Sequence, residues 1–318
     1  MTFSQEVKSE ILRSARRLQG GAATSFLTAV LKSAGSLTLS PNGFAFTLES
    51  DNLELLTLCK ILAEEQIGAQ VSIRTHELTV KNQLMHTCTF DSGVGEKLGL
   101  TARDNDGRLC LCQDVGALIP VEQSAARSFM QGLFVASGSV VIPALVLEKD
   151  GGAANALGTK YHLELRFTDE AFAEAVAASF SELDFHFLSR KRHFVLYLKD
   201  SEKISDFLVF VNATKSKFAL DDVIISRSLR NTSNRQTNCD LANASKTVTA
   251  AGKQLEAIAA LKRMGLFDAL PDSLKDVARL REDNETATLD EIADMLRISK
   301  SGASHRFAKL IELSQRKS

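Results

Sequence analysis

Apolar residues in the first two thirds of the chain recur with two different periods, and each period predicts a different element. In residues 24–34 and 124–137 they recur every three to four positions, which is typical of helices. Each of these runs stops at a glycine, a residue that can end a helix. The stretch YHLELRF at 161–167 alternates instead, which indicates a strand. The pattern therefore predicts a fold that mixes helices and sheet.

The order of these elements occurs twice, which indicates an internal duplication. The first copy has expected helices at 24–34, at 52–66 and ending near Leu100, and expected strands at 36–39, 43–49, 71–80 and 84–90. The second has expected helices at 124–137, at 168–180 with Thr168 as its cap, and at 201–211, and expected strands at 139–148, 161–167, 184–188 and 193–199. Each half therefore reads as helix, two strands, helix, two strands, helix.

Beyond about Asp221 the alternation stops and the chain becomes polar and helical. Residues 230–246 contain four asparagines and few large apolar residues, which indicates a linker leading into a helix. Amphipathic helices are expected at 253–264, ended by Gly265, and at 272–281. We therefore expect a duplicated domain at 1–220 with halves at about 20–105 and 120–215, a basic asparagine-rich linker at 221–250, and a helical domain at 251–318.

Two short segments near the end have the spacing of a helix-turn-helix. Thr288 can cap a helix whose apolar residues fall on one face up to Leu296. A three-residue break at 297–299 separates it from a second helix at 300 to about 313. Small residues stand where the two helices must approach, at Ala293 and Ala303. Two short helices with this spacing also occur by chance in helical bundles that do not bind DNA, so a purely structural role for the pair stays open.

In a helix-turn-helix the first turns of the second helix enter the major groove. Serine and histidine can hydrogen-bond base edges, whereas lysine and arginine neutralise phosphates. The candidate DNA contacts are Arg297, Ser299, Lys300, Ser301, Ser304, His305, Arg306 and Lys309. Ser299 or Ser301 can instead cap the helix. Arg297 stands where glycine is common, and a left-handed conformation there would cost about 1 kcal/mol. Further basic candidates precede this region, at Arg227, Arg230, Arg235 and Lys246.

Composition narrows the function classes. The 318 residues are 44% hydrophobic, which suits two or three domains, and no apolar run reaches the ~18 residues of a membrane span. A cytoplasmic location is therefore expected.

The formal charge of -1 argues against a uniformly basic protein, although the charges are unevenly placed. The five cysteines lack zinc-site spacing, and no histidine motif or phosphate loop is present, so neither a metal nor a cofactor is expected. The cysteines read as free thiols, with Cys59 on a buried helix face and Cys88 in a strand.

Three stretches, ISKSGASHRFAKL, RNTSNRQTNCDLANASKTVTA and YHLELRF, resemble the WhiA family of sporulation and cell-division regulators of Gram-positive bacteria. The resemblance covers nearly the whole chain. It implies an α+β fold, with a duplicated αββαββα domain similar to LAGLIDADG homing endonucleases and an all-α helix-turn-helix domain that resembles sigma-factor region 4. It also implies promoter DNA as the partner, a nucleoid-associated location, and roles in transcription, cell division, chromosome segregation and, in spore-formers, sporulation. Other transcription or division proteins as partners, and the oligomeric state including a monomer, stay open.

The resemblance can be followed to the catalytic positions of the homing endonucleases. There two packed helices each end in an acidic residue before a glycine, and these acids hold the catalytic metal. The matching segments are 27–35 (LTAVLKSAG) and 130–138 (MQGLFVASG), so the acids are replaced by Ala34 and Ser137. Neither side chain offers the carboxylate that hard cations require, so no nuclease activity is expected. The alternatives are a non-catalytic scaffold of the division machinery and a residual endonuclease that uses other carboxylates.

The resemblance further implies a saddle-shaped sheet that could contact DNA. Its basic candidates are Arg74, Lys81, Arg166, Arg190, Lys191 and Arg192. The last three fit a solvated hairpin tip equally well. Glutamates on the same strands would repel a duplex if they share that face, namely Glu49, Glu77 and Glu164.

Overall fold

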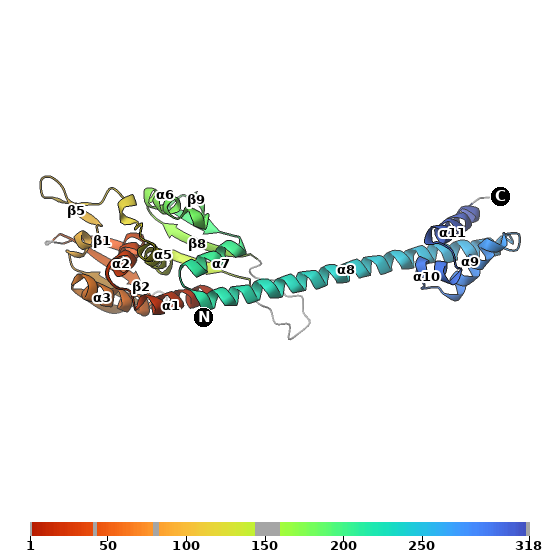
Figure 1. Ribbon diagram of the computed structural model, residues 1–318, viewed down its shortest axis with the longest axis horizontal. Coiled ribbons are helices and arrows are strands. Elements are labelled where there is room, and N and C mark those ends of the chain that lie inside the picture. The colour runs from red at the N-terminus through yellow and green to blue at the C-terminus, as the bar shows by residue number, and fades with distance from the viewer. Residues whose placement is uncertain (1, 41–42, 79–82, 144–159, 316–318) are drawn as a thin grey trace. The chain divides into compact units, whose positions relative to one another are not determined.

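The computed structural model describes residues 2–40, 43–78, 83–143 and 160–315. The chain divides into two compact units, Met1–Ser226 and Arg227–Ser318 (Figure 1). Each unit buries its own cluster of apolar side chains. Each therefore has its own hydrophobic core.

The first unit contains the expected duplication. After α1 (Phe3–Ala15), the first half consists of α2 (Gly20–Ala34), β1 (Gly35–Ser40), β2 (Gly43–Ser50), α3 (Leu53–Ile67), β3 (Val71–Leu78), β4 (Gln83–Phe90) and α4 (Val94–Lys97). The second half consists of α5 (Gln123–Ser137), β7 (Gly138–Val141), β8 (His162–Phe167), α6 (Glu170–Ser179), β9 (His186–Arg190), β10 (His193–Leu198) and α7 (Ser201–Phe210). The element order of both halves is the one that the hydrophobic pattern predicts.

The two halves also share one sheet topology. The strand orders are β1-β2-β4-β3 and β7-β8-β10-β9, with antiparallel neighbours throughout. On β2 of the first sheet alternate residues are buried, as Phe46 and Leu48 are, whereas on β8 of the second sheet the run from Leu163 to Leu165 is buried throughout. This correspondence in space is what a duplication of the sequence requires.

Helices α2 and α5 pack against each other at the centre of the unit, between the two sheets (Figure 1). Gly132 allows this approach, since a Cβ atom there would lie 2.5 Å from the carbonyl oxygen of Phe26 and 3.0 Å from the Cβ of Ala29. Ala29 and Gly132 are thus the small residues at this helix contact. The contact joins the two halves into one core.

Two details of the first unit differ from expectation. Helix α6 is capped by Asp169, not Thr168, because the Asp169 carboxylate accepts the amide of Phe172 at 3.2 Å and also binds the ammonium of Lys32. A small hairpin, β5 (Thr101–Arg103) and β6 (Leu109–Leu111), lies between the halves and was not anticipated, because its strands have only three residues each. The expected strand at 139–148 is described as far as Val141, and residues 144–148 lie outside the described residues.

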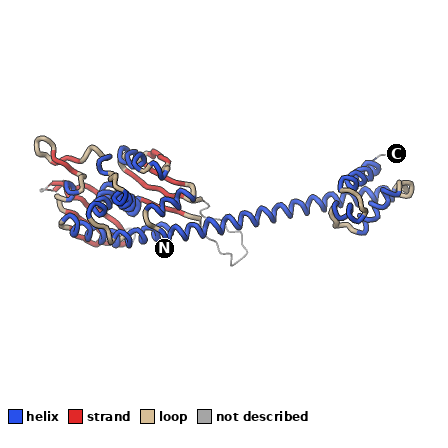
Figure 2. The backbone as a smooth tube through the Cα atoms, in the orientation of Figure 1, coloured by secondary structure: helices blue, strands red, loops and turns tan. Residues whose placement is uncertain are grey.

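Residues 221–250, expected as a linker that leads into a helix, are themselves helical. These residues belong to α8 (Thr214–Arg263), a helix of 50 residues that runs without interruption (Figure 2). The physical reason lies in the sequence, since neither proline nor glycine occurs from residue 214 to 251. Polar side chains that could compete with the backbone donate to carbonyls one turn back, as Thr232 does to Ser228 at 3.0 Å. Asparagine content therefore did not signal a helix break.

Three more helices complete the second unit, α9 (Asp272–Asp283), α10 (Leu289–Met295) and α11 (Lys300–Gln315). Their apolar faces meet the end of α8 in one cluster that includes Ile258, Val277, Ile292 and Phe307. Gly265 follows α8 with a φ of 68°, the left-handed conformation expected of a residue that ends a helix.

Candidate nucleic-acid interface

The turn between α10 and α11 is built by hydrogen bonds that the local sequence dictates. Thr288 and Glu291 form a reciprocal capping box at the start of α10. At its end the amide of Ile298 donates to the carbonyl of Ala293, and the amide of Arg297 donates to that of Asp294, both at 3.0 Å. Arg297 has a φ of 54°, so it takes the left-handed position of a Schellman motif that glycine usually fills. The strain expected at Arg297 is therefore present.

Helix α11 begins directly after this turn. The Ser299 hydroxyl accepts the amide of Gly302 at 3.1 Å, so Ser299 takes the capping role that the sequence left open between it and Ser301. Ala303 and Ala293 are both buried where α10 and α11 meet. The two helices thus approach as a helix-turn-helix requires, and Phe307 fixes the inner face of α11 in the core.

The opposite face of the first two turns of α11 is free of packing. Lys300, Ser301, Ser304 and His305 are all exposed there, as the spacing predicts. The ammonium of Lys300 lies 2.6 Å from the carboxylate of Asp290, and both side chains are more than half exposed. Such a surface pair contributes about 0–1 kcal/mol, so phosphate can readily replace the carboxylate. The sequence analysis did not identify Asp290, because acidic residues are common in the first turn of a helix, where they interact favourably with the helix dipole.

The other two basic candidates on α11 point elsewhere. The guanidinium of Arg306 lies 3.5 Å from the carbonyl oxygen of Ser273 at the start of α9, and the ammonium of Lys309 pairs with Glu312 at 2.8 Å. Both side chains flank the exposed face and do not stand on it. The basic candidates upstream lie on α8, where Arg230, Arg235 and Lys246 are exposed and Arg227 is half-buried.

In the first unit, Ala34 and Ser137, the two positions expected to replace catalytic acids, line one pocket of about 500 Å³. Ala34 and Ser137 are joined there by basic and hydroxyl side chains, among them Lys8, Ser33, Ser139, Arg166, Thr168 and His193. None of the described residues lining this pocket carries a carboxylate. Burial lowers the pKa of the Lys8 ammonium, an effect that the charge of Asp51 opposes. Nothing in the local sequence of α1 pointed to Lys8 as a neighbour of these positions.

The open faces of both sheets carry mixed charge. Glu49 and Arg74 stand opposite the same residue, Thr87, in adjacent strand pairs, so they share a face. On β8, Glu164 binds the guanidinium of Arg166 and lies 3.2 Å from the ring of His162. Burial alone would raise the pKa of the Glu164 carboxyl, but the hydrogen bonds from Arg166 and His162 hold it below its usual value. These carboxylates weaken the case for a duplex on the sheets.

The remaining sheet candidates are dispersed. Arg190 ends β9, and Lys191 and Arg192 form the turn to β10, all three exposed. Glu77 stands opposite Leu84, on the other side of β3 from Arg74. Lys81 lies outside the described residues.

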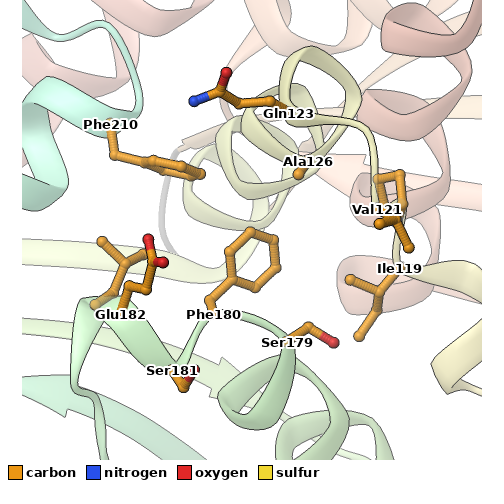
Figure 3. A pocket seen from close by; sticks show the side chains of 11 residues that line it. Ile119, Val121, Gln123, Ala126, Ser179, Phe180, Ser181, Glu182 and Phe210 are labelled. Atoms are coloured by element: carbon orange, nitrogen blue, oxygen red, sulfur yellow. The ribbon is translucent and has the colours of Figure 1, made fainter.

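A second cavity, of about 430 Å³, lies between the segment before α5 and the ends of α6 and α7 (Figure 3). Its walls are mostly apolar, with the rings of Phe180 and Phe210 5.9 Å apart between centroids. Among the described residues that line it, Glu182 is the one with a charged side chain. A single carboxylate with no acid or base partner provides no chemistry for hydrolysis.

The cysteines of the chain are free thiols. Cys59 on α3 and Cys88 on β4 are buried, as expected, and burial raises the pKa of the Cys88 thiol to about 12. Within the described ranges no group of three or more metal-ligating side chains comes together. Across the same residues, no helix combines the length and the apolar character needed to cross a membrane.

Comparison with known protein families shows whether the last helices belong to a known helix-turn-helix family or to an unrelated helical bundle. The model of the WhiA LAGLIDADG-like domain matches residues 23–84, 126–148 and 150–230, and that of the WhiA C-terminal HTH domain matches residues 233–314. The chain belongs to the WhiA family. The resemblance drawn from the asparagine-rich segment and the last two helices is therefore confirmed.

Relatives in the WhiA family cover the whole chain. "Probable cell division protein WhiA" of Staphylococcus aureus (strain USA300) is 30% identical over 99% of this chain and 97% of its own length. The full-length DUF199/WhiA from Thermatoga maritima has 20% identity and a TM-score of 0.57, covering 100% of this chain and 99% of that one. The isolated N-terminal LAGLIDADG domain of DUF199/WhiA has 17% identity and a TM-score of 0.45, covering 66% and 90%. The family models and the full-length structure together show a LAGLIDADG-like domain followed by a helical WhiA helix-turn-helix region, as expected.

Proposed function

We propose that the chain is a sequence-specific DNA-binding regulator of transcription, in which α11 enters the major groove of promoter DNA. The observation that carries this proposal is the division of α11 into two faces. Its inner face is fixed in the core by Ala303, Phe307 and Leu310, whereas Lys300, Ser301, Ser304 and His305 stand exposed on its first two turns. A rigid helix with an unpacked polar face is the geometry that groove reading requires.

The electrostatics of the turn agree with this role. Lys300 is the first residue of α11, and a phosphate would have only its exposed ion pair with Asp290 to replace. Arg297 projects from the turn itself and is exposed. Both charges lie where α11 begins, next to the exposed serine and histidine side chains, so they are placed to contact the phosphates that border the groove.

The test is a fluorescence-anisotropy titration of the full chain on duplex DNA selected by that chain from a random library. Lys300→Ala should weaken binding about 3- to 10-fold and lower the slope of log affinity against log salt by about one. Lys262→Ala is the matched control, since Lys262 is also a half-exposed lysine in an ion pair, with Glu282 at 2.7 Å. Unchanged affinity and slope in Lys300→Ala would contradict the role of α11.

The same proposal treats the first unit as a domain that does not cleave DNA. The pocket at Ala34 and Ser137 offers hydroxyl and basic groups where a metal needs carboxylates. Incubation of the protein with supercoiled plasmid and magnesium should leave the plasmid intact. Magnesium-dependent nicking that co-purifies with the protein through a second column would overturn this part.

The regulated process is proposed from the relatives. Because relatives are named as probable cell division proteins, we place the target promoters among genes of cell division. Chromosome segregation and, in spore-forming organisms, sporulation are finer proposals of the same kind, as is a location on the nucleoid. Crosslinking and sequencing of bound DNA tests them together. Absence of enrichment above background would favour a scaffold that binds other division proteins.

A further inference from the structure

We propose that α8 contains a second base-reading surface, formed by Asn231, Asn234 and Asn238, that enters a major groove in addition to α11. The inference rests on the proposed DNA binding and deepens it. It concerns only the part of α8 that belongs to the second unit. The ligand is double-stranded DNA, read through base edges and not only through its phosphates.

The spacing of the three asparagines places them on one face. Steps of three and four residues bring side chains to the same side of a helix, and seven residues span about 10 Å, the height of about three base pairs. Every residue from 228 to 246 is exposed, so nothing in the second unit covers this face. Arg235 stands at its border. Ala242 and Ser245 continue the face with small side chains, which lets a groove approach closely.

These asparagines have no structural role that would explain them. Among the described residues, the side chains of Asn231, Asn234 and Asn238 form no hydrogen bond, whereas Gln236 on the opposite side bonds Asp240 at 3.1 Å. Asparagine in an exposed helix interior costs about 0.5–0.7 kcal/mol relative to alanine. A helix that served only as a spacer would be more stable with alanine, glutamate or lysine. An amide in this position can instead bond bidentately to adenine.

Charge favours DNA over a protein as the partner. Between residues 227 and 250 the basic side chains are Arg227, Arg230, Arg235 and Lys246, and the one acidic residue is Asp240. Asp240 lies about half a turn away from Asn238 and so points away from the asparagine face. Of the exposed apolar residues, Leu241 and Val248 share a side one heptad apart, but Leu229, 12 residues before Leu241, lies about a third of a turn away, so the side carries a single heptad step. They therefore offer no seam for a coiled coil with a second copy.

The test uses the full chain with single and combined alanine variants. The probe is a 40-base-pair duplex selected from a random library by the wild-type protein, with a scrambled duplex beside it. Asn238→Ala should lower affinity for the selected duplex by about 5- to 100-fold, leave the scrambled duplex unchanged and leave the salt slope unchanged, because a neutral amide releases no counterion. Asn243→Ala is the matched control on the opposite face, and should alter affinity less than two-fold.

A second readout locates the contact. Methylation of guanine N7 in the major groove should interfere with binding at positions outside the segment protected by α11, and Arg235→Ala should remove part of that interference. Circular dichroism should show equal or higher helix content in every asparagine variant.

The outcomes separate this inference from the function on which it rests. If Lys300→Ala weakens binding while Asn231→Ala/Asn234→Ala/Asn238→Ala keeps the affinity and sequence preference of the wild type, the second surface is overturned and DNA binding by α11 stands. If the wild type selects no duplex, both fail. A combined variant that changes the sedimentation coefficient but not DNA affinity would identify a protein contact and also overturn the inference.

Discussion

The guanidinium of Arg281 lies over the ring of Phe307, with 5.3 Å between its central carbon and the ring centroid. Arg281 is 2% exposed, and its hydrogen bonds go to the side-chain oxygen of Gln254 at 2.9 Å and to the carbonyl oxygens of Ala287 at 2.6 Å and Asn284 at 3.2 Å. One side chain on α9 thus joins the end of α8, the loop before α10 and the inner face of α11. Burial lowers the pKa of this guanidinium.

Arg281→Met should loosen the whole helix-turn-helix region. Methionine fills similar volume but leaves the carbonyls of Ala287 and Asn284 without donors, at a cost of about 2–3 kcal/mol. Hydrogen exchange of the full chain should then speed up at the amides of α11 by about 30- to 150-fold. The exposed Arg279→Ala on the same helix is the control and should leave exchange unchanged. Equal exchange in both variants would show that Arg281 does not hold the unit together.

Arg297→Gly should stabilise the turn while it removes a charge from the interface. The φ of 54° at Arg297 costs a non-glycine residue about 1 kcal/mol, which glycine recovers. Exchange at α10 and α11 should slow by about five-fold in Arg297→Gly but not in Arg297→Ala, which keeps the strain. Both variants should bind DNA more weakly with a lower salt slope. Tighter DNA binding by Arg297→Gly would mean that the arginine contributes nothing to the interface.

Gly132→Ala should destabilise the first unit, because the new Cβ would lie 2.5 Å from the carbonyl oxygen of Phe26, which cannot move without shifting α2. The expected loss is about 1–3 kcal/mol, seen as a lower melting temperature of the first unit. Gly21→Ala in α2 is the matched control. No atom lies within 4 Å of its Cβ position, so alanine should be neutral or stabilising by up to about 1 kcal/mol. Equal melting temperatures would show that α2 and α5 adjust to the added methyl group.

The sequence predicted the elements that carry strong periodicity and missed the relationships between distant segments. The paired halves and the two last helices followed from apolar spacing, because an element with one buried face must repeat at its own period. Thr168 was predicted to cap α6, but Asp169 provides the cap. Both side chains can cap a helix, and the sequence does not show that Lys32, from another helix, binds the Asp169 carboxylate. Lys8 and Arg281 could not be identified, since the side chains around them come from other elements, such as Ser33 on α2 for Lys8 and Gln254 on α8 for Arg281.

In helix α8 the local sequence suggested a linker that is absent and gave no sign of the cap that begins the helix. Its asparagines indicated a linker, yet helix formation prevailed because neither proline nor glycine occurs from residue 214 to 251, the part of the helix that contains them. Its start also depends on a residue that spacing could not reveal. The carboxylate of Glu10 on α1 accepts the amides of Lys215 at 2.7 Å and Ser216 at 2.9 Å, and so caps α8 from another helix. A cap supplied from 205 residues away leaves no signature in the neighbouring sequence.

The carboxylate of Glu164 should make the first unit less stable in acid. Its folded-state pKa lies below the usual 4.5, because hydrogen bonds from Arg166 and His162 outweigh the effect of burial. The stabilisation is therefore complete above about pH 4.5, the value in the unfolded chain, and is lost as the pH falls through the lower folded-state pKa. Glu164→Gln should melt at a lower temperature than the wild type at pH 7, and the difference should shrink progressively below pH 4.5. The exposed Glu49→Gln on the other sheet is the control and should leave the melting temperature at pH 7 unchanged. A difference between Glu164→Gln and the wild type that is constant from pH 7 to pH 3 would mean that the pair with Arg166 acts through packing and not through charge.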